Sequence, residues 1–327
     1  MARGHPGLPK KVAPVVLRKA DIFRDLARID ADPAARQRVL DMETDFRQRI
    51  SSHIAALPAS SSQFQKFNTS PFVLMFYSKQ QGYSHVSEIE KDIIPAKVFS
   101  SMETSAGRMV ETVVLPVYGW QTVPSTMHSV ESVLDGKRVT PGQTLYAATL
   151  KSGPRCLNDE MAKDIGVDVV THSPDWANAV GANTVEFTYG VLYGTKRQSN
   201  KKDWHILRNI GQVITPPAQI ISPCAGNWRI SYRSQQLTVN STVRVGIEWW
   251  DYLGGPGTWV ELCVALIRAC IVPSNSARQP PTYSISDLGA ILRLDSLPAG
   301  YNVALLQHSQ LEWLLFLARH FCDEIRP

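Results

Sequence analysis

The sequence predicts an α/β fold with a mixed central sheet flanked by helices, together with a small N-terminal helical domain. Three observations carry this prediction. Residues 184–193 form a continuous β-type run of the kind a buried central strand needs, and a second β-rich run covers 144–150. Segments with helical periodicity at 16–57, 95–114 and 256–272 surround these runs. A chain of 327 residues is long enough for one core and an appendage.

The N-terminal part begins with a basic, proline-containing arm at 1–14. In the helical region that follows, Ile22, Leu26 and Ile29 share one face, and Asp32-Pro33 is a typical N-cap with a first-turn proline. The serine-rich run that ends at Ser62 is typical of a linker. We therefore expect an N-terminal basic arm and helical domain over 1–62 and a second, larger domain over 63–327.

The middle of the chain predicts helices at 85–92 and 95–114, and in the second helix Phe99 and Met102 belong to an apolar stripe that we expect to be buried. Residues 129–134 alternate polar and apolar, which favours a strand, and the following Asp-Gly pair is a turn signal. The remaining predicted elements are a helix at 155–165, a polar loop at 194–202, a strand at 242–247 and an amphipathic tail at 311–321.

The composition limits the functional classes. A net charge of +5 fits a polyanionic partner. The five cysteines form no CxxC pair and no zinc-ligand spacing, which favours a reducing cytoplasm. We expect no membrane association, because no secretory signal opens the chain and no apolar run approaches the roughly 20 residues of a membrane span. The glycine-rich stretch 254–257 lacks the Lys-Ser/Thr of a phosphate-binding loop.

The most informative chemistry lies at Glu131 and Lys151. Two neighbouring strands would bring this carboxylate and this lysine to one edge of a sheet. A carboxylate holds a divalent metal through oxygen, and a lysine beside it orients water next to a phosphate, which is phosphodiester-hydrolysis chemistry. Ser152-Gly153-Pro154 then breaks the strand, and Arg155 opens a predicted helix that carries Asn158. Arginine and asparagine are the side chains that bind guanine and adenine edges bidentately.

Each of these signals also has a structural interpretation. An acid and a lysine at this separation occur in many chains as solvated strand ends. The basic residues of the 194–202 loop form either a phosphate clamp or a solvated turn. Glu111 is either a support of the metal site or a surface charge, and His128 fits a structural histidine better than a site residue. The pair Trp249-Trp250 fits the core better than a base-stacking platform.

The order acid–strand–Leu-Lys–helix resembles the PD-(D/E)XK nuclease core of type II restriction endonucleases. Further segments resemble the branch that cuts GG/CC cores interrupted by a central base pair, the CCGG-reading group. The resemblance spans about 95–272. The segments that carry it are 101–111, 130–134, 150–154, 189–194, 206–208 and 243–250.

The resemblance implies roles for individual residues. Glu131 matches the first metal-binding carboxylate and Lys151 the catalytic lysine, whereas Thr149 stands where the second acid is expected. In the CCGG-reading group that acid comes from the following helix, where Asp164 lies closest to the family spacing and Glu160 is the alternative. Arg155 matches the first arginine of the guanine-reading motif, and the rest of that motif is absent.

These implications predict a Mg²⁺-dependent, sequence-specific endonuclease that cuts double-stranded DNA as a homodimer. Two alternatives stay open: a low-specificity nuclease of the same core, and a non-catalytic DNA-binding protein on a degenerate nuclease fold, which Thr149 favours. The expected catalytic residues are Glu131, Lys151, Asp164, Glu160 and Glu111, and the expected metal contacts are Glu131, Leu150 and Asp164. The expected DNA contacts are Arg155, Asn158, Lys163, Lys196, Arg197, Lys201 and Lys202.

Overall fold

The computed structural model describes residues 12–56, 71–82, 86–124, 129–199, 202–222, 228–271, 305–307 and 310–326. The chain divides into two compact units, one formed by Met1–Thr44 with Glu111–Pro327 and the other by Asp45–Val110. The predicted domain boundary at residue 62 falls outside the described residues and stays a prediction.

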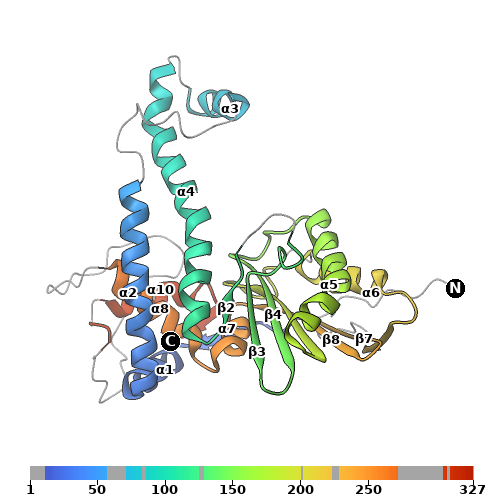
Figure 1. The fold of residues 1–327 in the computed structure, drawn as a ribbon. Coiled ribbons are helices and arrows are strands. Elements are labelled where there is room, and N and C mark those ends of the chain that lie inside the picture. Colours follow the sequence, from blue (N-terminus) through green and yellow to red (C-terminus); the bar gives the residue numbers. More distant parts are fainter. Residues whose placement is uncertain are drawn as a thin grey trace. The chain divides into compact units, whose positions relative to one another are not determined.

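The larger unit is built on a mixed seven-stranded sheet with the order β2-β3-β4-β5-β8-β7-β6, which confirms the predicted α/β class (Figure 1). The central strands β4, β5 and β8 are parallel, and the strands on both sides of them are antiparallel. The strands are β2 (Gln121–Thr122), β3 (Gly136–Thr140), β4 (Thr144–Lys151), β5 (Thr184–Val191), β6 (Gln219–Ser222), β7 (Arg229–Ser234) and β8 (Leu237–Val245).

One face of this sheet forms the main hydrophobic core with α5 (Asp159–Val180) and α6 (Lys202–Val213), which pack against each other (Figure 1). Strand side chains alternate between the two faces, so the odd-numbered residues of the central strands lie on this side. Phe187 of β5 stacks on Trp176 of α5, with ring centroids 6.4 Å apart. The core also contains Leu145, Ala147, Val185, Tyr189, Val239 and Val243.

The opposite face is covered only in part by α7 (Ile247–Gly254) and by residues that follow α4 (Val86–Val117). Gly190 of β5 has no room for a side chain, because a Cβ atom there would lie 2.8 Å from the Trp249 ring. Trp249 and Trp250 are 0% and 1% exposed, so both tryptophans belong to the core as predicted. Trp120 packs edge-on against Trp249, Tyr252 and Tyr146.

The first helices of the chain belong to the same unit as its last described residues. Helix α1 (Lys19–Ala31) contacts α8 (Thr258–Cys270), and α8 contacts α10 (Leu311–Ala318). Strand β1 (Val16–Arg18) pairs in parallel with β9 (Glu324–Arg326). The break between α1 and α2 (Pro33–Ala56) falls at Asp32, as the sequence predicts.

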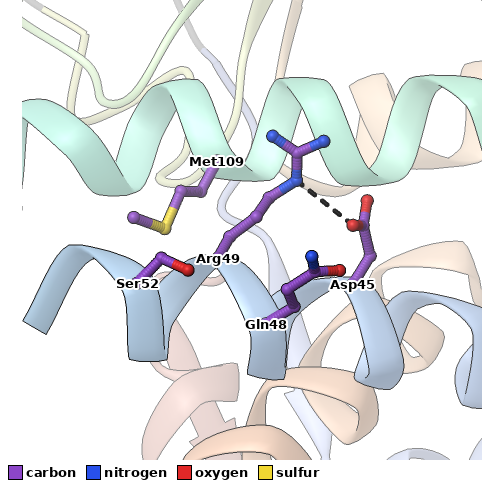
Figure 2. Close-up of a pocket in the computed structure, with 5 residues that line it drawn as sticks. All are labelled: Asp45, Gln48, Arg49, Ser52 and Met109. Carbon is purple, nitrogen blue, oxygen red and sulfur yellow. Dashed lines mark ion pairs between the residues drawn. The ribbon is translucent and has the colours of Figure 1, made fainter. Parts of the chain in front are cut away.

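The smaller unit consists of the second half of α2, the helix α3 (Pro71–Gln81) and most of α4. A pocket in this unit is lined by two helices, with Asp45, Gln48, Arg49 and Ser52 on α2 and Met109 on α4 (Figure 2). Arg49 is ion-paired with Asp45 at 3.3 Å (Figure 2). The pocket thus carries a neutralised arginine rather than a free charge.

The predicted buried stripe on α4 is wrong at two positions. Phe99 is 64% exposed and Met102 is 37% exposed, and only further along the helix do Val113 and Val114 become buried. The buried residues lie where α4 enters the larger unit and meets its core. The two helices predicted at 85–92 and 95–114 form one continuous helix. Among the described residues, no helix combines the length and apolarity needed to cross a membrane.

Candidate active site

The carboxylate of Asp135 and the side chain of Lys151 lie at neighbouring strand ends. Asp135 immediately precedes β3, where its backbone N–H donates to the carbonyl of Ala148 at 2.8 Å. Its Oδ2 accepts the backbone N–H of Leu150 at 2.6 Å. The carboxylate is therefore fixed beside the end of β4, one residue before Lys151.

Lys151 is the last residue of β4 and its side chain is half-exposed. Its backbone carbonyl accepts the N–H of Leu192, which holds the strand end against the segment that follows β5. The Lys151 ammonium forms no ion pair with any residue that the structure describes. The predicted lysine therefore lies where a strand ends, with its charge available to a ligand.

Glu131 does not lie on a strand, so the strand predicted at 129–134 is wrong. Residues 130–133 form a turn, and the next strand begins only at Gly136. Of the apolar residues in this stretch, Leu134 is buried in the core and Val130 is exposed. The Glu131 carboxylate accepts two hydrogen bonds from Lys137 Nζ, at 2.6 and 2.8 Å. A lysine therefore neutralises this carboxylate.

Thr149, at the position of the expected second acid, is 3% exposed, and its hydroxyl donates to the carbonyl of Val133 at 2.6 Å. The two helix carboxylates proposed in its place, Glu160 and Asp164, are both exposed on α5. Within the described residues, no three His, Cys, Asp or Glu side chains gather closely enough to hold a metal.

The helix after Lys151 starts later and extends further than the predicted 155–165. Asn158 is its N-cap, with Oδ1 accepting the N–H of Met161 at 2.8 Å, and α5 then runs from Asp159 to Val180. A capping residue ends the preceding loop, so Arg155 lies in a turn and does not open the helix. Arg155 has a φ of 91°, in the left-handed region, and its Nε donates to the carbonyl of Gln198 at 3.2 Å.

That hydrogen bond joins Arg155 to the polar loop between β5 and α6. Of the basic residues predicted there, Arg197 is exposed. Lys196 is ion-paired with Glu248 at 2.7 Å and lies 5.3 Å from the centre of the Trp228 ring, so a structural role competes with phosphate binding. Lys201 and the side chain of Lys202 lie outside the described residues, as does His128.

The other predicted residues lie on helices. Lys163 is exposed on α5, on the same stretch as Glu160 and Asp164. Glu111 is half-exposed on α4, at the point where this helix enters the larger unit.

Two aspartates that the sequence interpretation missed anchor the loop that carries Lys196 and Arg197. At its end, Asp203 is fully buried and accepts hydrogen bonds from Ser199 Oγ at 2.7 Å and from Tyr189 OH at 3.2 Å. Burial raises the pKa of the Asp203 carboxyl, and it also raises the pKa of Tyr189. An aspartate after two lysines looks like a surface residue, and only the amphipathic periodicity of 202–213 could have indicated its burial.

Asp323 anchors the start of the same loop. Its Oδ1 accepts the hydroxyl of Thr195 at 2.7 Å, and its Oδ2 accepts the backbone N–H of Val15 at 2.8 Å. The N–H of Gly194 also donates to the carbonyl of His320, at 2.5 Å. Asp323 therefore connects the N-terminal segment, the loop after β5 and the last strand. Contacts between segments this distant along the chain leave no local sequence signal.

No protein-family model matches the chain, and no curated protein matches it in sequence.

Proposed function

We propose that the protein is a Mg²⁺-dependent endonuclease that cleaves double-stranded DNA at specific sites, with the chemistry at Asp135 and Lys151. The observation that carries this proposal is the geometry of two adjacent strand ends. A carboxylate held by the Leu150 amide lies beside a half-exposed lysine whose charge has no described ion-pair partner. The order of acid, strand, Leu-Lys and helix supports the resemblance to PD-(D/E)XK nucleases when Asp135, rather than Glu131, is taken as the acid.

The donor set fits Mg²⁺ held partly by the substrate. Magnesium usually keeps several waters and binds through one or two carboxylates plus substrate phosphates, so a closed protein cage is not required. Asp135 supplies such a carboxylate, and Glu131 is the alternative if its pairing with Lys137 opens. When bound, the metal supplies polarisation of the phosphate and a lower pKa for water.

The residues of the chain then have distinct roles. Lys151 orients the attacking water and offsets the negative charge that develops on the phosphate. Arg155, exposed and held to the loop after β5, contacts a base edge, and Arg197 contacts the phosphate backbone. A homodimer places one such site on each strand of a palindromic duplex. The reducing cytoplasm is the proposed location of the protein.

A second candidate, a non-catalytic DNA-binding protein, is favoured by Thr149. The hydroxyl of this residue is buried and used by the backbone of Val133, so the usual second carboxylate is missing from its strand.

Incubation of the purified protein with plasmid DNA and Mg²⁺, with and without a chelator, tests both candidates. Discrete fragments that need the metal support the site-specific nuclease, and sequencing of their ends identifies the site. A smear indicates a nuclease of low specificity. DNA binding without cleavage supports the second candidate.

A further inference from the structure

The sheet face opposite α5 and α6 is hydrophilic along β8 and the first half of β5, which is unusual for parallel strands. Parallel sheets are normally covered on both faces, and their strands are apolar throughout. Strand β8 instead alternates strictly, with every second residue buried and the residues between them half-exposed. On β5, the neighbouring Glu186 is half-exposed too. The half-exposed residues of β8 on this face are Thr238, Asn240, Thr242 and Arg244.

The strand register extends this surface across the sheet. Arg229 of β7 pairs with Thr242, and Arg233 pairs with Thr238, so both arginines share the face of the half-exposed β8 residues. Both arginines are exposed, and neither forms an ion pair with a described residue. We call the surface formed by Arg229, Arg233, Thr238, Asn240 and Thr242 the polar sheet face.

Positive charge dominates this side of the sheet. Arg138 and Arg244 lie on the same side of the sheet as Arg229 and Arg233. Each is held by aromatic rings, with Arg244 4.2 Å from the centre of the Tyr252 ring and Arg138 5.1 Å from that of Tyr146. The carboxylate that the strands place there, Glu186, already accepts a hydrogen bond from Asn240 Nδ2 at 2.6 Å. On the described strands, four arginines therefore share this side of the sheet with one carboxylate.

We propose that the polar sheet face binds the phosphate backbone of duplex DNA outside the site around Lys151. Arginine, threonine, serine and asparagine are the side chains that contact phosphates and sugars in protein–DNA complexes. Arg229 and Arg233 are four residues apart on one strand, about 14 Å, so they contact separate phosphates. This inference rests on the proposed function, because the ligand of the polar sheet face is the same DNA duplex that the site around Lys151 is proposed to cleave.

The test is the salt dependence of DNA binding. The double variant Arg229→Gln/Arg233→Gln and the control Arg24→Gln/Arg36→Gln remove the same charge, the control from exposed positions on α1 and α2. Affinity for a fluorescent random-sequence duplex is measured by anisotropy over a salt series without metal. Each lost phosphate contact makes the slope of log K against log salt less steep by about 0.9. The slope of the sheet variant is therefore expected to be less steep by about 2, and that of the control to be unchanged.

Equal slopes for parent and sheet variant would overturn this inference alone if the parent still cleaves DNA with Mg²⁺. A parent protein that neither binds nor cleaves duplex DNA would overturn the proposed function as well. Size-exclusion chromatography of both variants tests whether the polar sheet face is instead a dimer interface. If the sheet substitutions convert a dimer into a monomer while leaving the slope unchanged, the face contacts a second copy of the chain, and the DNA assignment is wrong.

Discussion

Lys151 combines a fixed backbone with a charge that is available to a ligand. In the proposed reaction its ammonium stabilises charge that appears only in the transition state. Lys151→Ala should therefore lower the rate of DNA cleavage by on the order of 100-fold or more while changing DNA affinity little. Single-turnover cleavage and anisotropy measure the two effects. Lys79→Ala on α3 is the control, since this exposed lysine lies in the other unit. Cleavage near the parent rate in Lys151→Ala would exclude the proposed site.

Asp135 and Glu131 are the alternative metal carboxylates of the proposed site, and their contacts distinguish them. Asp135 accepts a backbone amide beside Lys151, whereas Glu131 is neutralised by Lys137. We expect Asp135→Asn to abolish Mg²⁺-dependent cleavage and Glu131→Gln to retain most of it. Cleavage rates over a Mg²⁺ titration compare the two variants. The opposite pattern would return the role to Glu131.

Asp203 should give the folding stability a specific pH dependence. Burial raises the pKa of its carboxyl above the ordinary value of 3.8, so the folded state binds more protons than the unfolded state between the two values. Stability contributed by this group is therefore present below pH 3.8 and is lost as the pH rises through the folded pKa.

The variant Asp203→Asn removes this titration. Its free energy of unfolding should accordingly rise relative to the parent as the pH increases, and urea unfolding over a pH series measures the difference. A difference that is constant with pH would mean that Asp203 does not titrate in this range.

These residues show where sequence interpretation stops. Lys151 could be placed because a β-rich run ends at it and a strand breaker follows. The Asp-Gly pair at 135–136 is typical of a turn. Gly136 is nevertheless the first residue of β3, because Asp135 already pairs with β4 through its backbone. The acid that the sequence predicts on the strand before Lys151, Glu131, therefore lies in a turn, and Asp135 is the acid that immediately precedes β3.

Among the elements, those with a long, regular pattern were predictable. The β4 and β5 strands and the α8 helix lie close to their predicted ranges. Helix α6 was missed because its first turn is charged and follows a polar loop, and β6 and β7 because they are short. Residues 242–247 were predicted as one strand, but β8 ends at Val245 and α7 begins at Ile247, where Gly246 takes a positive φ of 58°.

The loop between β5 and α6 is an element whose position depends on Asp323. Asp323→Ala removes the acceptor of the Thr195 hydroxyl and of the Val15 N–H, so the loop should open more often. Limited trypsin digestion should then cut after Arg197 several-fold faster than in the parent. The neighbouring Glu324→Ala is a matched control, because that carboxylate is exposed and pairs only locally with Arg326. Equal digestion rates would show that Asp323 does not hold the loop.

At the scale of the whole molecule, the larger unit gathers residues from distant parts of the chain. The Glu261 carboxylate on α8 is 5% exposed and accepts two hydrogen bonds from Arg38 on α2, at 2.7 and 2.8 Å. Tyr118, just after α4, donates a third at 2.6 Å. Three helical segments are thus joined at one buried carboxylate.

Glu261→Gln should lower the free energy of unfolding by about 2–3 kcal/mol. This is less than the 3–5 kcal/mol typical of fully buried pairs, because the Arg38 side chain is 29% exposed to solvent. Urea unfolding measures the change, and Asp21→Asn, which removes an exposed ion pair with Arg24, should cost less than about 1 kcal/mol. Equal losses in the two variants would mean that the buried cluster adds no more than a surface pair.

Thr195 and Asp323, which share a hydrogen bond, are 128 residues apart in the sequence, so Thr195 is synthesised well before its partner. A ribosome makes Asp135, Lys151 and Arg155 well before it makes the aspartate that secures the neighbouring loop. Nascent chains and prematurely terminated fragments therefore carry the residues of the proposed chemistry without the aspartate that holds the loop after β5. The contact that holds Thr195 can form only after residue 323 has been synthesised.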